Sequence, residues 1–575
     1  MKLYHFNIIR KGQKALRLVL TCLVVLPGLN AIAQKPQVEE VTIIGIFNPT
    51  ISDANKILRN PVLQDTTIPL PAMNYSIVSQ PLDVSFPVYR IDAMKTDLDQ
   101  DKELLKNYIK GGFGNFTTPY FEFFANKPQS KKSGFGMHYR HISSKNTPEH
   151  YTKADMSSNQ AEIFGKLFSR NSTLTGTIGF DRLMVHRYGF ITDSIADSLL
   201  PSSDQLRQVY TLVNTRLGIE SMDSKRSDLN YNIFLDAYFL GDKFDTRETG
   251  IGLNGKLETN VDLLGFKNSQ TLGMNYKADM WSQKMDTAAG ITNSLISLQP
   301  YFGTSVEEYE LWLGLNASIL TDTATEFSVF PKIKGALNII PNVLRLWAGI
   351  DGYYSANSML TNYRTNPYIS SQQQFLFSKT GFEFSGGLSS SLGRFLDMNI
   401  RVRGGNTNDA VFFINDTTER YLNTFVIQSD DVDYIEGGIE FSFNRRDAWR
   451  VLIGATYTTI STDSIVKPWH TPEMVFYVNG MVKITPKMTL TANLNAFGKM
   501  FARNFIWNSN LNRFDEHAPL ELNSFLDASV GLRYQFNSHF SAFANFNNLA
   551  GKKYQRWNQY PVYGFNMLAG ISYSF

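Results

Sequence analysis

Apolar and polar side chains alternate along the last part of the chain. In residues 526–536 the apolar side chains stand at every second position, and polar or small residues fill the positions between them. The same pattern returns in residues 565–575, which end on the aromatic Phe575. Because successive side chains of a β-strand point to opposite faces of a sheet, the pattern predicts strands with one apolar face and one polar, solvated face.

The alternation runs through most of the chain from about residue 104 onward, which predicts an all-β protein. A soluble sandwich would show it too, but some 22 strands, an even number, are typical of a bacterial single-chain transmembrane barrel. We therefore predict a transmembrane antiparallel up-and-down β-barrel over residues 104–575. Its strands are expected at 104–116, 119–127, 133–144, 157–170, 173–188, 208–222, 228–242, 249–262, 269–284, 291–306, 309–322, 327–341, 343–357, 379–393, 395–405, 432–445, 448–463, 470–486, 488–502, 521–537, 539–549 and 563–575.

The connections between these strands alternate between short and long. Long connections are expected at 145–156, 189–207, 358–378, 406–431, 503–520 and 550–562. Outer-membrane barrels have short periplasmic turns and longer outer loops. The order of short and long connections therefore predicts that both ends of the barrel lie on the periplasmic side.

Charged residues of the predicted strands fall on the polar face, which we expect to line the lumen. An outer face without charge suits lipid, where an arginine at the bilayer midplane costs about 2–4 kcal/mol. The lumen-facing charges either bind a polar or anionic solute or a plug, or are simply solvated. These candidates are Arg401, Arg403, Glu436, Glu440, Lys483 and Arg533.

Composition supports a membrane barrel over a set of soluble domains. Aromatic residues make up 13% of the chain, and charged residues only 19%, against a usual share of about 25%. Beyond the amino terminus we find no uninterrupted apolar run of about 18 residues, so we expect no spanning helix in the mature protein. A mean hydropathy of −0.21 does not argue against a barrel, because alternation hides the apolar face.

Residues 1–33 have the features of a secretory signal peptide. Five basic residues precede the apolar core 18–26, and Ala31-Ile32-Ala33 provides a small-residue cleavage site. The single cysteine, Cys22, lies within this signal. Removing the five basic residues turns the net charge from +3 to −2, which gives no support to nucleic-acid binding.

Residues 34–103 differ from the rest of the chain. Pro69, Pro71, Pro81 and Pro87 interrupt any long strand or helix. We expect this segment to be a small periplasmic or plug-like piece.

The last strands resemble those that close TonB-dependent outer-membrane receptors. The resemblance rests on the run 544–549 (ANFNNL), on Lys552-Lys553-Tyr554, on Tyr563-Gly564-Phe565 and on the terminal GISYSF. It implies a barrel of about 22 strands with a plugged lumen. It also implies that the barrel-assembly machinery reads Tyr573 and Phe575 as the carboxy-terminal signal of a barrel seated in outer-membrane lipid.

A second motif lies near the amino terminus. The run Glu39, Glu40, Val41, Thr42, Ile43, Ile44 and Gly45 is similar to the energy-coupling box of Bacteroidetes-type receptors. In that family the box pairs with the protein TonB as an added strand. The stretch between Gly45 and Leu104 is shorter than the family's plug, so the resemblance implies a shortened or degenerate plug.

No motif in the sequence indicates catalysis, and we expect neither an enzyme nor a bound cofactor or metal. His138 and His141 are three positions apart on a predicted strand, so they face opposite sides and cannot share a metal ion. Aromatic residues in and around the predicted outer loops form either a ligand platform or a membrane-interface girdle with loop packing. They include Tyr363, Tyr368, Phe412, Phe413, Phe505, Trp507 and Trp557.

The sequence therefore favours an outer-membrane receptor or transporter barrel that mediates uptake or passage of a solute and is linked to TonB. Two alternatives stay open. One is a scaffold subunit whose barrel is closed by a partner lipoprotein or plug subunit, and the other is a passive channel.

Overall fold

The computed structural model describes residues 107–575, apart from 128–131, 194, 223–228, 263–268, 287–289, 419–420, 446–447, 509 and 512. The expected signal at 1–33, the segment at 34–103 and the motif Glu39–Gly45 lie outside the described residues.

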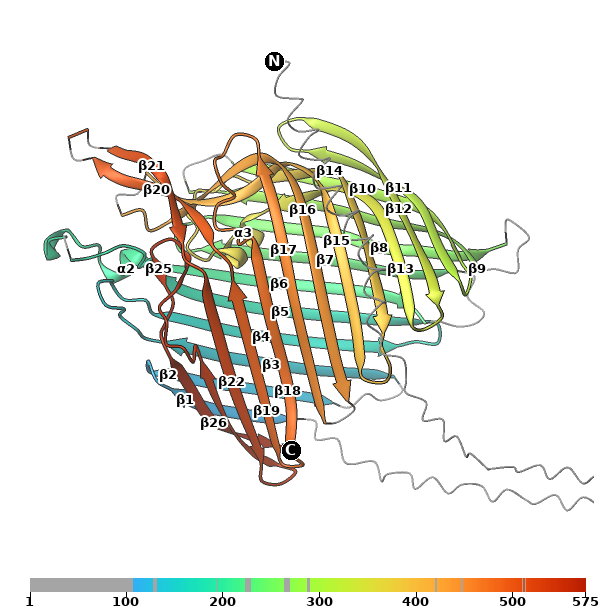
Figure 1. The fold of residues 1–575 in the computed structure, drawn as a ribbon, viewed down its shortest axis with the longest axis horizontal. Coiled ribbons are helices and arrows are strands. Elements are labelled where there is room, and N and C mark those ends of the chain that lie inside the picture. The colour runs from blue at the N-terminus through green and yellow to red at the C-terminus, as the bar shows by residue number, and fades with distance from the viewer. Residues whose placement is uncertain are drawn as a thin grey trace, which may run out of the picture. The chain divides into compact units, whose positions relative to one another are not determined.

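One antiparallel sheet of 22 strands forms the wall of a barrel (Figure 1). Its strands are β1 (Tyr108–Gly114), β2 (Thr118–Lys127), β3 (Ser133–Ser144), β4 (Met156–Phe168), β5 (Ser172–His186), β6 (Arg207–Ser221), β7 (Asn230–Asp242), β8 (Arg247–Val261), β9 (Ser269–Lys284), β10 (Ile291–Ser305), β11 (Tyr309–Thr321), β12 (Thr325–Ile340), β13 (Leu344–Asn357), β14 (Leu376–Ser391), β15 (Leu396–Asn415), β16 (Phe425–Arg445), β17 (Trp449–Thr462), β18 (Met474–Thr485), β19 (Met488–Phe497), β22 (Phe525–Gln535), β23 (Phe540–Asn547) and β26 (Asn566–Ser574).

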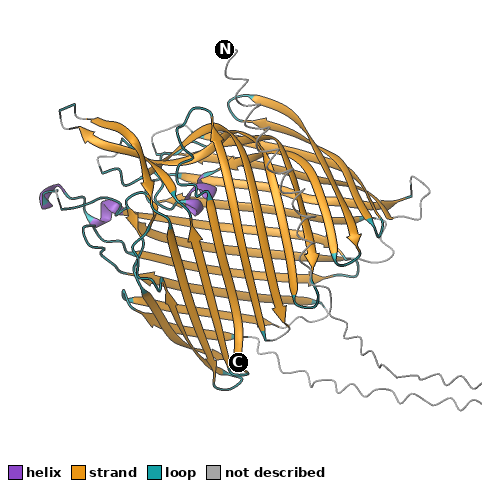
Figure 2. Cartoon of the chain, in the orientation of Figure 1, coloured by secondary structure: helices purple, strands orange, loops and turns teal. Residues whose placement is uncertain are grey.

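The remaining elements lie in connections between strands of the wall. Two small hairpins are made by β20 (Met500–Asn508) with β21 (Arg513–Leu522), and by β24 (Gln555–Trp557) with β25 (Tyr560–Pro561). The helical segments are η2 (Asp197–Leu199), α2 (Ser203–Leu206) and α3 (Met359–Thr365) (Figure 2). None of the helices in the described part of the chain is long and apolar enough to cross a membrane.

The barrel closes where the first strand pairs with the last. Strand β1 pairs with β26 from Tyr108 opposite Ser574 to Gly114 opposite Leu568. Beyond the strand ends, the backbones of Asn107 and Phe575 exchange two further hydrogen bonds of 3.1 and 3.0 Å. Every strand of the sheet therefore has a neighbour on both sides, which satisfies the backbone within a bilayer.

A glycine allows the two closing strands to approach. A Cβ placed on Gly570 would lie 2.1 Å from the carbonyl oxygen of Gly111 and 2.6 Å from the Cα of Gly112. Since real Cβ atoms do not approach backbone this closely, only glycine fits at this position of the seam.

The two faces of the wall differ as the alternation predicts. On β15, Ile400 and Val402 leave 37% and 44% of their surface exposed on the outside, and Ile435 of β16 is 52% exposed beside them. Arg401 lies between Ile400 and Val402 and Arg403 follows Val402, and both arginines point to the opposite face, where they contact Glu436. An uncharged, apolar outer face and a charged inner face are what a barrel embedded in a bilayer requires.

The prediction of a closed barrel with 22 strands is confirmed, and each predicted strand corresponds to one strand of the wall. The loop expected at 406–431 is wrong, because β15 and β16 extend through most of it. The register between them shifts between Thr407 and Ala410, and Asp409 has a φ of 53°. This bulge changes the phase of the alternation, so the strand looks interrupted in the sequence.

Residues 503–520 lie in a long connection, as expected, but this connection begins earlier and has its own structure. The strand expected to reach residue 502 ends at Phe497 in β19, and the chain then forms the separate hairpin β20–β21. Figure 1 shows this hairpin extending beyond the wall strands, at the end where α3 and the long loops lie.

Val402 offers a test of the inside–outside assignment. We expect Val402→Arg to lower the free energy of unfolding by about 2–4 kcal/mol, because the guanidinium would face lipid near the midplane. The measurement is equilibrium urea unfolding of barrels refolded in lipid vesicles. The control is Asn399→Arg on the same strand, which adds the same charge to the lumen face opposite Glu440 and should be nearly neutral. Equal destabilisation by both variants would contradict the assignment.

Candidate functional site: the outer-loop cap and the lumen wall

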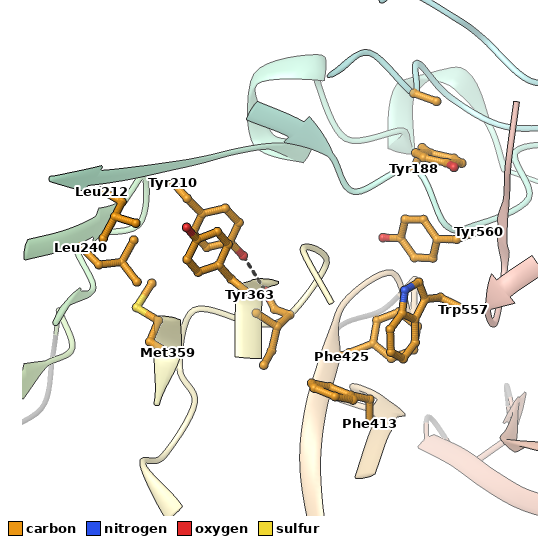
Figure 3. Packing of buried hydrophobic residues seen from close by; sticks show 12 residues of the cluster. Tyr188, Tyr210, Leu212, Leu240, Met359, Tyr363, Phe413, Phe425, Trp557 and Tyr560 are labelled. Carbon is orange, nitrogen blue, oxygen red and sulfur yellow. Dashed lines mark hydrogen bonds between the residues drawn. The ribbon is translucent and has the colours of Figure 1, made fainter. Parts of the chain in front are cut away.

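A large buried hydrophobic cluster lies at the outer end of the barrel, the end opposite Asn107 and Phe575. It joins side chains from four long connections, including Ala154 of the β3–β4 loop, with side chains from nearby strand ends (Figure 3). Tyr188 comes from the β5–β6 loop, Tyr363 and Ile369 from the β13–β14 loop, and Trp557 and Tyr560 from the β23–β26 connection. We call the described residues of the connections 145–155, 187–206, 358–375, 416–424, 463–473 and 548–565 the outer-loop cap.

Tyrosine side chains stabilise the centre of the cap through contacts between their rings and through hydrogen bonds from their hydroxyl groups. Tyr368 stacks on Tyr560 with ring centroids 3.7 Å apart, and Tyr188 meets Tyr560 edge-on at 4.9 Å. The Tyr188 hydroxyl donates to the carbonyl of Pro561 at 2.9 Å, and the Tyr560 hydroxyl donates to that of Asn423. Burial raises the pKa of Tyr368 to about 12 and that of Tyr560 well above its ordinary value, so these phenols stay protonated donors.

A buried carboxylate joins the cap to the wall. Glu248 of β8 is fully buried and accepts hydrogen bonds from the backbone N–H groups of Met359 at 2.7 Å and Leu360 at 3.1 Å. The Tyr238 hydroxyl donates to the same carboxylate at 2.7 Å. The first two amides of α3 would otherwise lack partners. Glu248 therefore fixes the β13–β14 loop to the inner face of the wall.

His470 holds a second junction of the cap as a neutral ring. Its Nδ1 lies 2.9 Å from the carbonyl oxygen of Phe413, and the backbone N–H of Asn558 donates to its Nε2 at 3.2 Å. This arrangement fixes the tautomer with the proton on Nδ1. Burial lowers the pKa of His470 to about 4, and the hydrogen bond to Phe413 only partly opposes the shift. The ring therefore connects two cap segments with the end of β15 only while it is uncharged.

The hairpin β20–β21 places aromatic side chains on an exposed surface. Trp507 packs edge-on against Phe514 with centroids 4.9 Å apart, and both line a hollow of about 790 Å³ together with Phe505. Arg503 forms two 2.7 Å hydrogen bonds to Glu516 across the hairpin. The hydrogen bonds from Arg503 lower the pKa of Glu516, so the pair stays charged near neutral pH.

The structure separates the aromatic candidates into two groups. Tyr363, Phe412, Phe413 and Trp557 are at most 9% exposed, and Tyr368 packs beside the same cluster. Loop packing accounts for this buried group. Phe505 and Trp507 lie instead on the exposed hairpin, where Trp507 keeps 45% of its surface accessible.

Three of the lumen-wall candidates contact one another. Arg403 donates to both oxygens of Glu436, at 3.0 and 2.8 Å, and its guanidinium lies 3.7 Å from Glu383. Arg401 lies 3.9 Å from Glu436. The Tyr434 hydroxyl donates to Glu383 and extends the group. These residues form a continuous ionic patch on the inner face of strands β14 to β16.

The other wall candidates stand apart from this patch. Glu440 accepts a 2.7 Å hydrogen bond from the Tyr477 hydroxyl. Arg533 lines a hollow of about 370 Å³ near the closing seam, together with Lys110 and Glu122. Lys483 lies near the end of β18, beside the short turn to β19.

The carboxy-terminal residues lie at the seam. Tyr573 packs against Phe540 with centroids 4.7 Å apart and against Phe575 at 5.7 Å, and about two fifths of each carboxy-terminal aromatic side chain is exposed. An aromatic row at this edge is typical of the interface between bilayer and water.

The two strand histidines bind different polar partners. His138 lies 3.2 Å from Glu122, whereas His141 lies 2.7 Å from Asn159. Over the residues that the structure describes, no group of three or more histidine, cysteine, aspartate or glutamate side chains is placed to hold a metal ion.

Comparison with solved structures finds similar barrels. The pyoverdine outer membrane receptor FpvA from Pseudomonas aeruginosa is 13% identical, with a TM-score of 0.60 over 82% of this chain and 78% of that chain. The FrpB iron transporter from Neisseria meningitidis is 11% identical, with a TM-score of 0.60 over 82% of this chain and 80% of that chain. The siderophore receptor PirA from Acinetobacter baumannii gives the same values.

These likenesses show that the chain has the fold of outer-membrane receptor barrels. No protein-family model and no curated protein sequence matches the chain.

Sequence reasoning missed the polar residues that hold the cap. His470 was expected to open a strand, but β18 begins at Met474 and His470 lies in the preceding loop. Glu248 was expected to lie in the turn before its strand. No local signal distinguishes either residue, because the backbone groups that they bind are 57 to 112 positions away.

We expect Glu248→Leu to weaken attachment of the β13–β14 loop by about 2–4 kcal/mol, because two buried amides of α3 lose their acceptor. The measurement is hydrogen exchange at the amides of Met359 and Leu360. The control is Glu258→Leu on the same strand, since Glu258 pairs with Lys256 at 2.7 Å and does not contact the cap. Unchanged exchange in Glu248→Leu would contradict the proposed attachment.

Acid should loosen the cap through His470. Above about pH 6.5 the ring is neutral in both the packed and the open cap, so it adds no pH dependence. Between about pH 6.5 and 4 the open form takes up a proton and the packed form does not, which favours opening by about 1.4 kcal/mol per pH unit.

The measurement is limited proteolysis of the cap as a function of pH. The control is His470→Asn, because asparagine tolerates the φ of 54° at this position but does not titrate. The difference between the two proteins isolates the histidine from nearby carboxylates. Parallel pH profiles would refute the role of His470.

Proposed function

We propose that the protein is an outer-membrane receptor that takes up a solute across the bacterial outer membrane with energy from TonB. The observation that carries this proposal is the single-chain closed barrel of 22 strands, which matches receptor and transporter barrels over 82% of its length. Those neighbours are named for pyoverdine, siderophores and iron. We extend to this chain only the class of function, uptake of a scarce solute.

The arrangement of the chain suggests how uptake would proceed. A solute would first meet the outer-loop cap, whose loops pack on one another through the buried cluster. Displacement of the cap would open a lumen whose wall carries the ionic patch around Arg403 and Glu436. Polar groups along such a wall offer successive weak contacts in place of one tight site.

Coupling to the inner membrane would use the amino-terminal segment. We propose that residues Glu39–Gly45 add as a strand to TonB, and that residues 34–103 form a shortened plug that gates the lumen. Strand addition relies on backbone hydrogen bonds, so proline should block it where a β-branched residue does not. The similarity of this motif to Bacteroidetes-type receptors supports the assignment.

Insertion of the barrel would follow from its carboxy terminus. We propose that Tyr573 and Phe575, on the strand that closes the seam, are read by the barrel-assembly machinery. A partner lipoprotein or plug subunit is not needed to close the barrel wall, because β1 and β26 of the same chain pair directly.

Ile43→Pro tests the link to TonB. We expect the purified full-length protein to bind the soluble periplasmic domain of TonB from the same bacterium, and Ile43→Pro to weaken that binding at least 10-fold. Ile43→Val is the matched control and should bind as the wild type does. Failure of the wild-type protein to bind TonB would refute the coupling. Solute passage that persists after the proton-motive force is collapsed would favour a passive channel.

A further inference from the structure

A cavity of about 560 Å³ opens where five outer connections meet. Arg187 contributes from the β5–β6 loop, Lys243 and Phe244 from the β7–β8 turn, Ser371 from the β13–β14 loop and Asp416 from the β15–β16 turn. Asp286 of the β9–β10 loop completes the wall. This volume is within the usual range for sites that bind small molecules.

The cavity contains a buried cation that has no counter-ion within ion-pair distance among the described residues. Arg187 is 8% exposed, and its Nη2 donates to the carbonyl of Ile369 at 2.9 Å and to the Ser371 hydroxyl at 3.3 Å. Its Nε is buried without a hydrogen-bond partner, and the guanidinium makes no ion pair with any carboxylate of the described residues. Burying an unpaired charge is costly, so this site favours an anion.

The surroundings of Arg187 add donors and an aromatic surface. The Ser371 hydroxyl already accepts hydrogen bonds from Arg187 and from Gln208 at 3.0 Å, so its own proton is left to donate. The guanidinium lies 4.8 Å from the ring centroid of Phe244, and the Lys243 ammonium lies 5.8 Å from the same ring. Two cations therefore lie beside one ring at the edge of the cavity.

Carboxylates on the other walls of the cavity indicate which further groups a ligand must carry. Asp416 is 5% exposed and is held by Thr418, which donates through its backbone at 2.9 Å and its hydroxyl at 2.7 Å. Asp245 and Asp286 also line the cavity. A purely anionic ligand would be repelled by these groups, whereas the hydroxyls of a polyol would donate to them.

We propose that this cavity binds a small hydroxylated anion, with its carboxylate or phosphate at Arg187 and its hydroxyls toward the aspartates. Sugar acids and sugar phosphates share this chemistry. The proposal rests on the proposed uptake function and names the chemical class of the solute that the receptor captures.

Binding is measured with the purified full-length protein in detergent, by calorimetry with glucuronate, glucose 6-phosphate and neutral glucose. We expect at least one of the two anions to bind and glucose to bind at least 10-fold more weakly. Arg187→Gln should weaken binding of the anion at least 10-fold, and Ser371→Ala should weaken it several-fold. Arg394→Gln, which removes an exposed arginine from the short β14–β15 turn outside the cavity and the cap, should change nothing.

Heat-dependent mobility in a denaturing gel shows whether each variant retains its folded barrel, and Ser371→Ala provides the test if Arg187→Gln does not fold. Binding of neither anion, or anion binding that survives both cavity substitutions, would overturn the proposal. Because this assay needs no TonB, it can fail while energised uptake is demonstrated, and it can succeed while coupling to TonB fails.

Discussion

The obligatory pairing of backbone groups in lipid is the constraint on which this structure depends. At a strand edge that faces hydrocarbon, each backbone N–H or C=O group without a hydrogen-bond partner costs several kcal/mol. The chain meets this constraint by pairing β1 with β26, its first wall strand with its last. The glycine at position 570, the even number of strands and the placement of both barrel ends on one side all follow from this closure.

Among the described residues, buried apolar side chains are concentrated in the outer-loop cap and at the strand ends beside it. The wall has lipid outside and polar side chains inside, whereas the outer-loop cap buries tyrosine, phenylalanine and tryptophan side chains as a soluble protein would. Polar groups then fix the cap to the wall. Glu248 and His470 each have partners for their buried polar atoms, which makes the cap a defined unit instead of a collection of mobile loops.

Much of the barrel was predictable because its rule is local. The side chain of Val402 faces lipid and those of its neighbours face the lumen, and this difference appears in the sequence as a period of two. The same rule fails where a bulge changes the phase, as it does between Thr407 and Ala410. The cap was not predictable, since an arginine such as Arg187 meets Ile369 only after both loops have folded.

The cap also has a consequence for biogenesis. Its contacts join residues very far apart along the polypeptide, such as Arg187 with Ile369, 182 positions away, and Tyr188 with Pro561, 373 positions away. Contacts of such long range form late, because the entropy of closing large loops must be overcome first. The cap therefore lacks Trp557 and Tyr560 until the final hairpin has been added, so its packing is completed only at the end of assembly.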